Sequence, residues 1–113
     1  MKVLDELVQK QAEQSKNAQE LVELVNFTEN LLDQEHLQPT EIQWKILVNH
    51  LDEMIRRSKT GEKLPEMDIN LFSDLSKKSM EMAEKVVQSV QNLEDNEQFL
   101  LAVHFENVQG NIF

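Results

Sequence analysis

Apolar residues recur at helical spacing through most of this chain. Between residues 21 and 32 they fall three or four positions apart, and similar spacing follows Thr40. This spacing gathers apolar side chains on one face of an α-helix, and that face has to be buried against other helices. Only two glycines and two prolines interrupt the 113 residues, which leaves little material for sheets and tight turns. The sequence therefore predicts an all-α bundle.

The helix boundaries are marked by local signals. The first core helix is expected from Leu21 to a point between Asp33 and His36. The second is expected over residues 41–58, with Thr40 as N-cap and Gln43 as its capping-box partner. Residues 1–20 contain good helix formers without an apolar stripe, and they are interpreted as an N-terminal helical arm or extension. A solvated helix, a frayed arm and an oligomerisation element all fit that composition.

The second half of the chain predicts two further helices after a polar connection. A long apolar face runs from about Asp68 to Leu93, and a kink or break is expected between residues 73 and 79. The last helix is expected over residues 96–108, with Asp95 as N-cap and Gly110 as C-terminal cap residue. Residues 109–113 would then form a C-terminal tail, and residues 21–108 the bundle itself.

The charge balance excludes several kinds of partner. Eleven basic and 21 acidic residues give a net charge of −10, which disfavours direct nucleic-acid binding. There is no cysteine, no apolar run long enough to span a membrane, and no signal peptide at the N-terminus, so a cytoplasmic protein without membrane contact is expected. The basic residues cluster near one helix end, where the helix dipole favours cations: Arg56, Arg57, Lys59 and Lys63.

Two histidines lie in unusual surroundings. His50 lies at the edge of an apolar helix face, and Arg57 follows two turns later on the same side. His104 is the single polar residue in an otherwise apolar run over residues 99–105. Each could be a core histidine that hydrogen-bonds a neighbour. His36 is interpreted as a terminal, exposed residue, and its pairing with Asp33 is too small a set for a metal site.

Two segments of the sequence together resemble the PTS regulation domain (PRD), a helical regulatory module of bacterial sugar phosphotransferase systems. The first, LVNHLDEMIRRSKTG, contains His50 with Arg57 seven residues later. The second, EQFLLAVHF, contains Glu97 with His104 seven residues later. The resemblance covers about residues 21–108 and implies a compact antiparallel bundle of four to five helices, present here as a single copy. Such domains commonly dimerise, so a homodimer is expected.

The resemblance also implies a function, namely carbohydrate-linked regulation of transcription through a separate regulator protein, with no enzymatic activity and no cofactor. His50 and His104 correspond to histidines that are reversibly phosphorylated by a phosphocarrier protein or a sugar-permease component. Arg57 corresponds to an arginine that organises the site, and Glu97 supports it. Asn49, which stands where several members have aspartate, is likewise expected to support the site. Arg56 is expected to help Arg57 offset the charge of the phosphoryl group.

Three other interpretations remain open from the residues. A phosphorelay histidine domain would have Lys and Gly closely following its histidine, whereas Leu, Asp, Glu and Met follow His50. A di-metal bundle would need repeated Glu-x-x-His pairs, which His50 and His104 do not form. A helical adaptor with structural histidines needs no further residues.

Overall fold

The structure is a computed structural model that describes residues 3–111, with side chains described from residue 6 to residue 111. It contains five α-helices and one short 3₁₀ helix: α1 (Val3–Glu13), α2 (Ala18–Gln34), α3 (Glu41–Thr60), η1 (Ile69–Phe72), α4 (Lys77–Gln88) and α5 (Glu97–Gln109). No strand occurs in this part of the chain. The predicted all-α bundle of four to five helices is confirmed.

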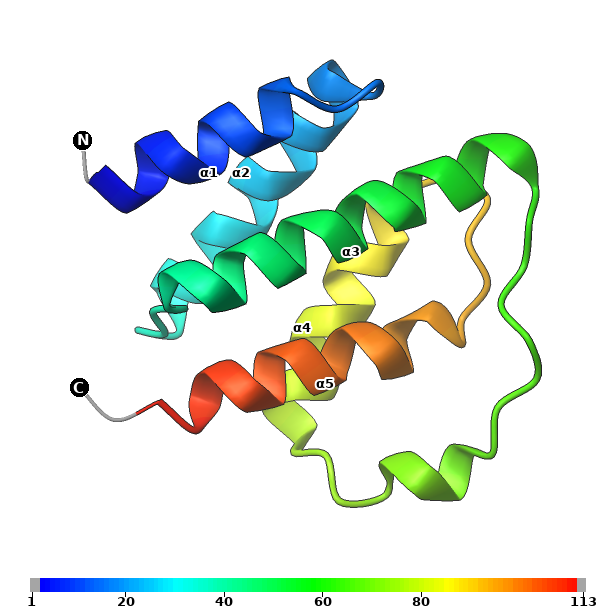
Figure 1. Ribbon diagram of the computed structural model, residues 1–113. Helices are drawn as coiled ribbons and strands as arrows, with labels where there is room; N and C mark the ends of the chain where they lie inside the picture. Colours follow the sequence, from blue (N-terminus) through cyan, green and yellow to red (C-terminus); the bar gives the residue numbers. More distant parts are fainter. Residues whose placement is uncertain (1–2, 112–113) are drawn as a thin grey trace.

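The helices pack around a common core, with α1 against α2, α4 against α5, and α3 in contact with both of these pairs (Figure 1). α1 and α2 pack against each other, and both pack against α3. α3 and α5 lie side by side and run in opposite directions, while α4 packs against α5 and α2. Because α3 and α5 are antiparallel neighbours, residues near the end of one helix face residues near the start of the other. This arrangement positions the candidate site.

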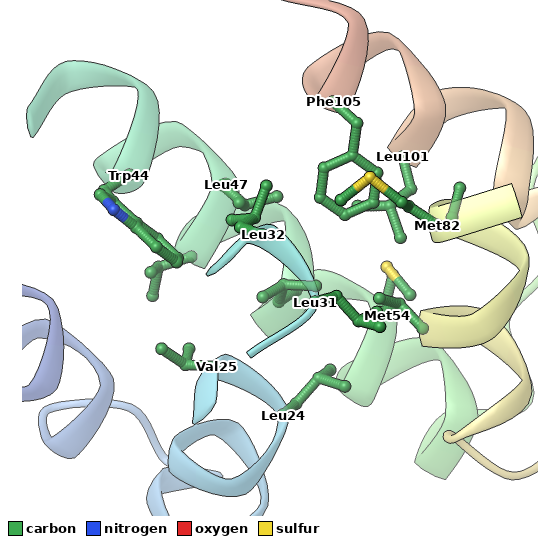
Figure 2. Close-up of a cluster of buried hydrophobic side chains, with 14 of the residues drawn as sticks. Leu24, Val25, Leu31, Leu32, Trp44, Leu47, Met54, Met82, Leu101 and Phe105 are labelled. Atoms are coloured by element: carbon green, nitrogen blue, oxygen red, sulfur yellow. The ribbon is translucent and has the colours of Figure 1, made fainter. Parts of the chain in front are cut away.

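The core draws on α2, α3, α4 and α5 together (Figure 2). The labelled side chains in the close-up come from all four helices and converge between them: Leu24, Val25, Leu31, Leu32, Trp44, Leu47, Met54, Met82, Leu101 and Phe105. The apolar face predicted for residues 21–32 is buried along its whole length, including Thr28, whose hydroxyl donates to the carbonyl oxygen of Leu24 (2.8 Å). Burial of these side chains is the main stabilising term.

The N-terminal segment forms a packed helix. α1 lies against α2 and α3, and the side chains of Val8 and Ala12 are 3% and 0% exposed. Leu7, by contrast, is largely exposed. Met1 and Lys2, and Ile112 and Phe113 at the other end, lie outside the described residues. The division of the chain at residues 20 and 108 stays a prediction.

The third predicted helix is shorter than its apolar pattern indicated. Residues 69–72 form only a 3₁₀ turn, and α4 starts after Ser76, whose hydroxyl caps the backbone N–H of Ser79. The chain is therefore broken within the segment where a kink or break was predicted. α4 ends at Gln88 rather than near Leu93, and the following connection contains Asn92 with a positive φ of 63°. Such a turn is incompatible with a continuing helix.

Of the two caps predicted for the last helix, Gly110 is confirmed as the C-terminal cap residue and Asp95 as N-cap is wrong. Asn96, not Asp95, occupies the N-cap position of α5, and its side chain makes no capping hydrogen bond. Asp95 contributes only its carbonyl oxygen, which accepts from the N–H of Gln98 (3.2 Å). Gly110 does end the helix, but with φ −75°, so its backbone does not need glycine. Gly61, with φ 77°, is the left-handed cap residue and follows α3.

The cap at the start of α3 gives a first testable prediction. Thr40 Oγ1 accepts from the N–H of Gln43 (3.2 Å), and Gln43 Oε1 accepts from the N–H of Thr40 (2.9 Å), which is the predicted capping box. Thr40→Ala is expected to lower the free energy of unfolding by about 1 kcal/mol. Urea denaturation measures this, with Thr40→Ser, which keeps the hydroxyl, as the control. Equal losses in both variants would contradict a role for the cap.

Candidate functional site: a histidine pair and an ion pair between two helices

Two pairs of side chains connect α3 with α5 like the rungs of a ladder. His50 on α3 faces His104 on α5, and Arg57 on α3 faces Glu97 on α5. Seven residues separate the two positions on each helix, which is about two helical turns. Because the helices run in opposite directions, equal spacing on both lets the two rungs form at once. We call these four residues the histidine–arginine ladder.

The first pair of the ladder, His50 and His104, which we call the upper rung, brings two imidazole rings into contact. The ring centroids of His50 and His104 are 4.8 Å apart, and the ring planes are tilted by 52°. Both residues are half-buried. The Nε2 atom of His50 is buried and has no hydrogen-bond partner, so this histidine is not a satisfied core residue. The structure thus brings together the two histidines that the sequence placed 54 positions apart.

The surroundings of this rung favour neutral imidazole. The pKa of His50 is lowered from 6.5 to about 4, mainly by burial and further by the nearby His104 and Arg57, while Glu53 opposes the shift. Burial also lowers the pKa of His104. Near neutral pH both rings are therefore uncharged, and each has a nitrogen with a free lone pair.

The second pair of the ladder, Arg57 and Glu97, which we call the lower rung, is a buried, bidentate ion pair. Arg57 Nε and Nη2 donate to the two carboxylate oxygens of Glu97, each at 2.7 Å. The two residues are only 7% and 2% exposed. Beside them, Asn96 Oδ1 is buried without a hydrogen-bond partner. A bidentate pair of this kind fixes the relative position of two helices more firmly than apolar contact does.

Arg56 and Asn49 have other partners. Arg56 extends from the protein surface and forms ion pairs with Glu53 (2.7 Å) and Glu62. Asn49 is exposed, and its Oδ1 accepts from Gln11 Nε2 on α1 (3.2 Å). The structure therefore shows neither of them as part of the histidine–arginine ladder, although sequence analysis assigned them to the site.

The remaining basic residues near the end of α3 also have acidic partners. Lys59 pairs with Glu20 on α2, and Lys63 pairs with Glu94 (2.8 Å). The cationic cluster seen in the sequence is thus neutralised residue by residue. Only Arg57 is directed into the protein between α3 and α5.

Sequence analysis missed a polar cluster at the start of α4. Glu106 Oε2 accepts from the hydroxyl groups of Ser76 (2.8 Å) and Ser79, and Gln109 donates to both serine hydroxyls. Hydrogen bonds from Ser79 and Ser76 lower the pKa of Glu106. The serine N-cap of α4 was visible in the sequence as a Ser-x-x-Ser pattern, but its carboxylate partner comes from α5 and carries no local signal.

The third histidine lies apart from the ladder. His36 is exposed and has a positive φ of 57° just after α2, and its N–H donates to the carbonyl oxygen of Asp33 (3.1 Å). Between residues 3 and 111, no group of three or more His, Asp or Glu side chains is placed to hold a metal ion. No helix in that range is both long enough and apolar enough to cross a membrane.

The fold and the ladder together define a helical module with two histidines facing each other across antiparallel helices. A model of the PRD domain family matches residues 22–108, and the chain belongs to that family. A solved structure of a PRD-containing transcription regulator from Lactobacillus casei is 41% identical, with a TM-score of 0.87, over 93% of this chain and 94% of the other. No curated protein matches significantly. The chain is therefore a regulatory PRD domain.

Proposed function

We propose that this domain is reversibly phosphorylated on His50 and His104 by a component of the sugar phosphotransferase system, in the cytoplasm. The observation that carries the proposal is the contact between the two imidazole rings at 4.8 Å, in a member of the PRD family. A partly buried histidine pair in which His50 Nε2 has no hydrogen-bond partner is poorly explained by stability alone. The donor would be the phosphocarrier protein or a sugar-permease component.

The protonation state of the pair suits this chemistry. An imidazole attacks phosphorus through a nitrogen lone pair, so it must be neutral when the donor binds. Lowered pKa values keep both rings neutral at cytoplasmic pH. The phosphoryl group adds a charge of about −1.5 to −2 beside an apolar core, in a chain with a net charge of −10. Arg57 is the nearby cation that offsets part of this charge.

The consequence would be a change in how α3 and α5 pack. Arg57 already pairs with Glu97, so a phosphoryl group on the upper rung competes with that carboxylate for the same guanidinium. Weakening the lower rung loosens the connection between the two helices. A separate regulator protein, or a second copy of the domain in a homodimer, would then respond to the changed packing of α3 and α5. In this way the domain would regulate sugar-dependent transcription.

The proposal is tested with phosphoenolpyruvate, the general phosphotransfer enzyme and the phosphocarrier protein. The wild-type chain is expected to acquire acid-labile phosphate, and the double variant His50→Gln/His104→Gln to acquire none. His36→Asn is the matched control, because it removes the one other histidine and asparagine tolerates the positive φ at this position. It is expected to be phosphorylated like the wild type.

A second interpretation, a helical adaptor with structural histidines, is favoured by the partial burial of both rings between α3 and α5. It makes the opposite prediction. Histidine substitutions would then lower the free energy of unfolding and leave all interactions with phosphotransfer proteins unchanged. Absence of phosphate on the wild-type chain, together with unchanged binding by the double variant, would replace the phosphorylation proposal with the adaptor.

A further inference from the structure

We infer that His50 and His104 form a single phosphoryl site, so that each folded chain holds one phosphoryl group rather than two. The inference deepens the proposed function, because it concerns the stoichiometry of the same histidines. It starts from the distance between the rings. With centroids 4.8 Å apart, the two rings are in direct contact between α3 and α5.

Core packing beside the rings keeps α3 and α5 together at this level of the bundle. This packing does not depend on the Arg57–Glu97 pair, which the first phosphoryl group would weaken. The residues next to the histidines on both helices are fully buried in the core, namely Leu51, Met54, Leu101 and Phe105. Such packing resists separation because it would open a cavity between the helices. A second phosphoryl group would therefore have to enter beside the first.

The charges at the site oppose a second phosphoryl group. Two groups of about −1.5 each, roughly 8 Å apart at an effective dielectric constant of about 20, disfavour the doubly modified state at least about 100-fold. Among the residues whose side chains are described, Arg57 is the one buried cation, and it is already paired with Glu97. Glu53 adds a further negative charge near His50.

Either ring can nevertheless accept the first group. A neutral imidazole nitrogen attacks phosphorus, a nitrogen–phosphorus bond forms, the bond from phosphorus to the donor breaks, and the ring N–H proton passes to the leaving group. With phosphoramidate as donor the leaving group is ammonia, which departs as ammonium. This small donor reaches partly buried imidazoles and makes the stoichiometry measurable without the protein donor.

The experiment counts phosphoryl groups by intact-mass spectrometry at high pH, where phosphohistidine is stable. The His36→Asn chain is treated with phosphoramidate to completion, so that only His50 and His104 are available. We expect one phosphoryl increment on the folded chain and two on the same chain unfolded in urea. The single variants His50→Gln and His104→Gln, made in this background, are each expected to accept one increment.

These variants separate sharing from simple inaccessibility. If both single variants accept a group while the parent accepts only one, the two rings share a site. Two increments on the folded parent at comparable rates would overturn the inference, and so would the failure of either single variant to react. The phosphocarrier protein in place of phosphoramidate tests the proposed function separately: no transfer from it, with one increment from phosphoramidate, refutes the donor and not the shared site.

Discussion

Arg57→Ala is expected to lower the free energy of unfolding by about 3–5 kcal/mol, an exceptionally large loss for one charged residue. The substitution leaves the carboxylate of Glu97, only 2% exposed, without its partner and out of reach of water. Removing one member of a buried ion pair costs more than the pair contributes, because the remaining charge is uncompensated. Urea denaturation, monitored by circular dichroism, measures the loss in free energy of unfolding.

Two matched variants identify the cause. Arg56→Ala removes the neighbouring arginine, whose ion pairs with Glu53 and Glu62 lie on the protein surface, and is expected to have a far smaller effect. The double variant Arg57→Met/Glu97→Leu removes both charges and keeps similar volumes. It is expected to recover most of the stability lost in Arg57→Ala. If Arg57→Ala were no worse than Arg56→Ala, the ion pair would not connect the helices as described.

The ladder was largely predictable because its signals are local and periodic. His50 and Arg57 lie on one helix face by their spacing alone, and so do Glu97 and His104. The family resemblance then implied that the two faces meet. The sequence could not show that Arg57 would pair with Glu97 rather than remain free for a phosphoryl group. That pairing depends on the antiparallel packing of α3 on α5, which no single segment encodes.

The contacts that the sequence did not indicate depend on distant segments or on competition between neighbouring residues. Arg56 precedes Arg57, and the two positions are about 100° apart around the helix, so their guanidinium groups point in different directions. Arg56 instead finds Glu53 one turn away and Glu62 beyond the cap. Asn49 is held by Gln11 on α1, a helix whose docking the polar N-terminal sequence did not indicate. The carboxylate of Glu106 reaches α4 for the same reason, through tertiary packing alone.

The free energy of unfolding is expected to fall by about 3 kcal/mol as the pH is lowered from 6.5 to 4. The cause is the pKa of His50, which folding lowers from 6.5 to about 4. Within this range the unfolded chain binds a proton at His50 and the folded chain does not, so acid favours the unfolded state. The contribution is fully present above pH 6.5. His104, whose pKa folding also lowers, adds to the loss in the same direction.

The pH profile of His50→Gln isolates this effect. Glutamine does not titrate, so the difference in stability between wild type and variant should shrink or change sign between pH 7 and pH 4, by about 3 kcal/mol in total. The carboxylate of Glu106, whose pKa folding lowers below 4.5, loses its contribution at the acidic end of the range in both proteins and cancels in the comparison. Glu53 interacts with His50, so its own pKa differs between the two proteins. Chemical denaturation at half-unit pH intervals gives both curves. Parallel curves would mean that His50 is charged as readily in the folded chain as in the unfolded one. At mildly acidic pH the folded chain would then contain a His50 imidazolium, instead of the neutral ring that accepts a phosphoryl group.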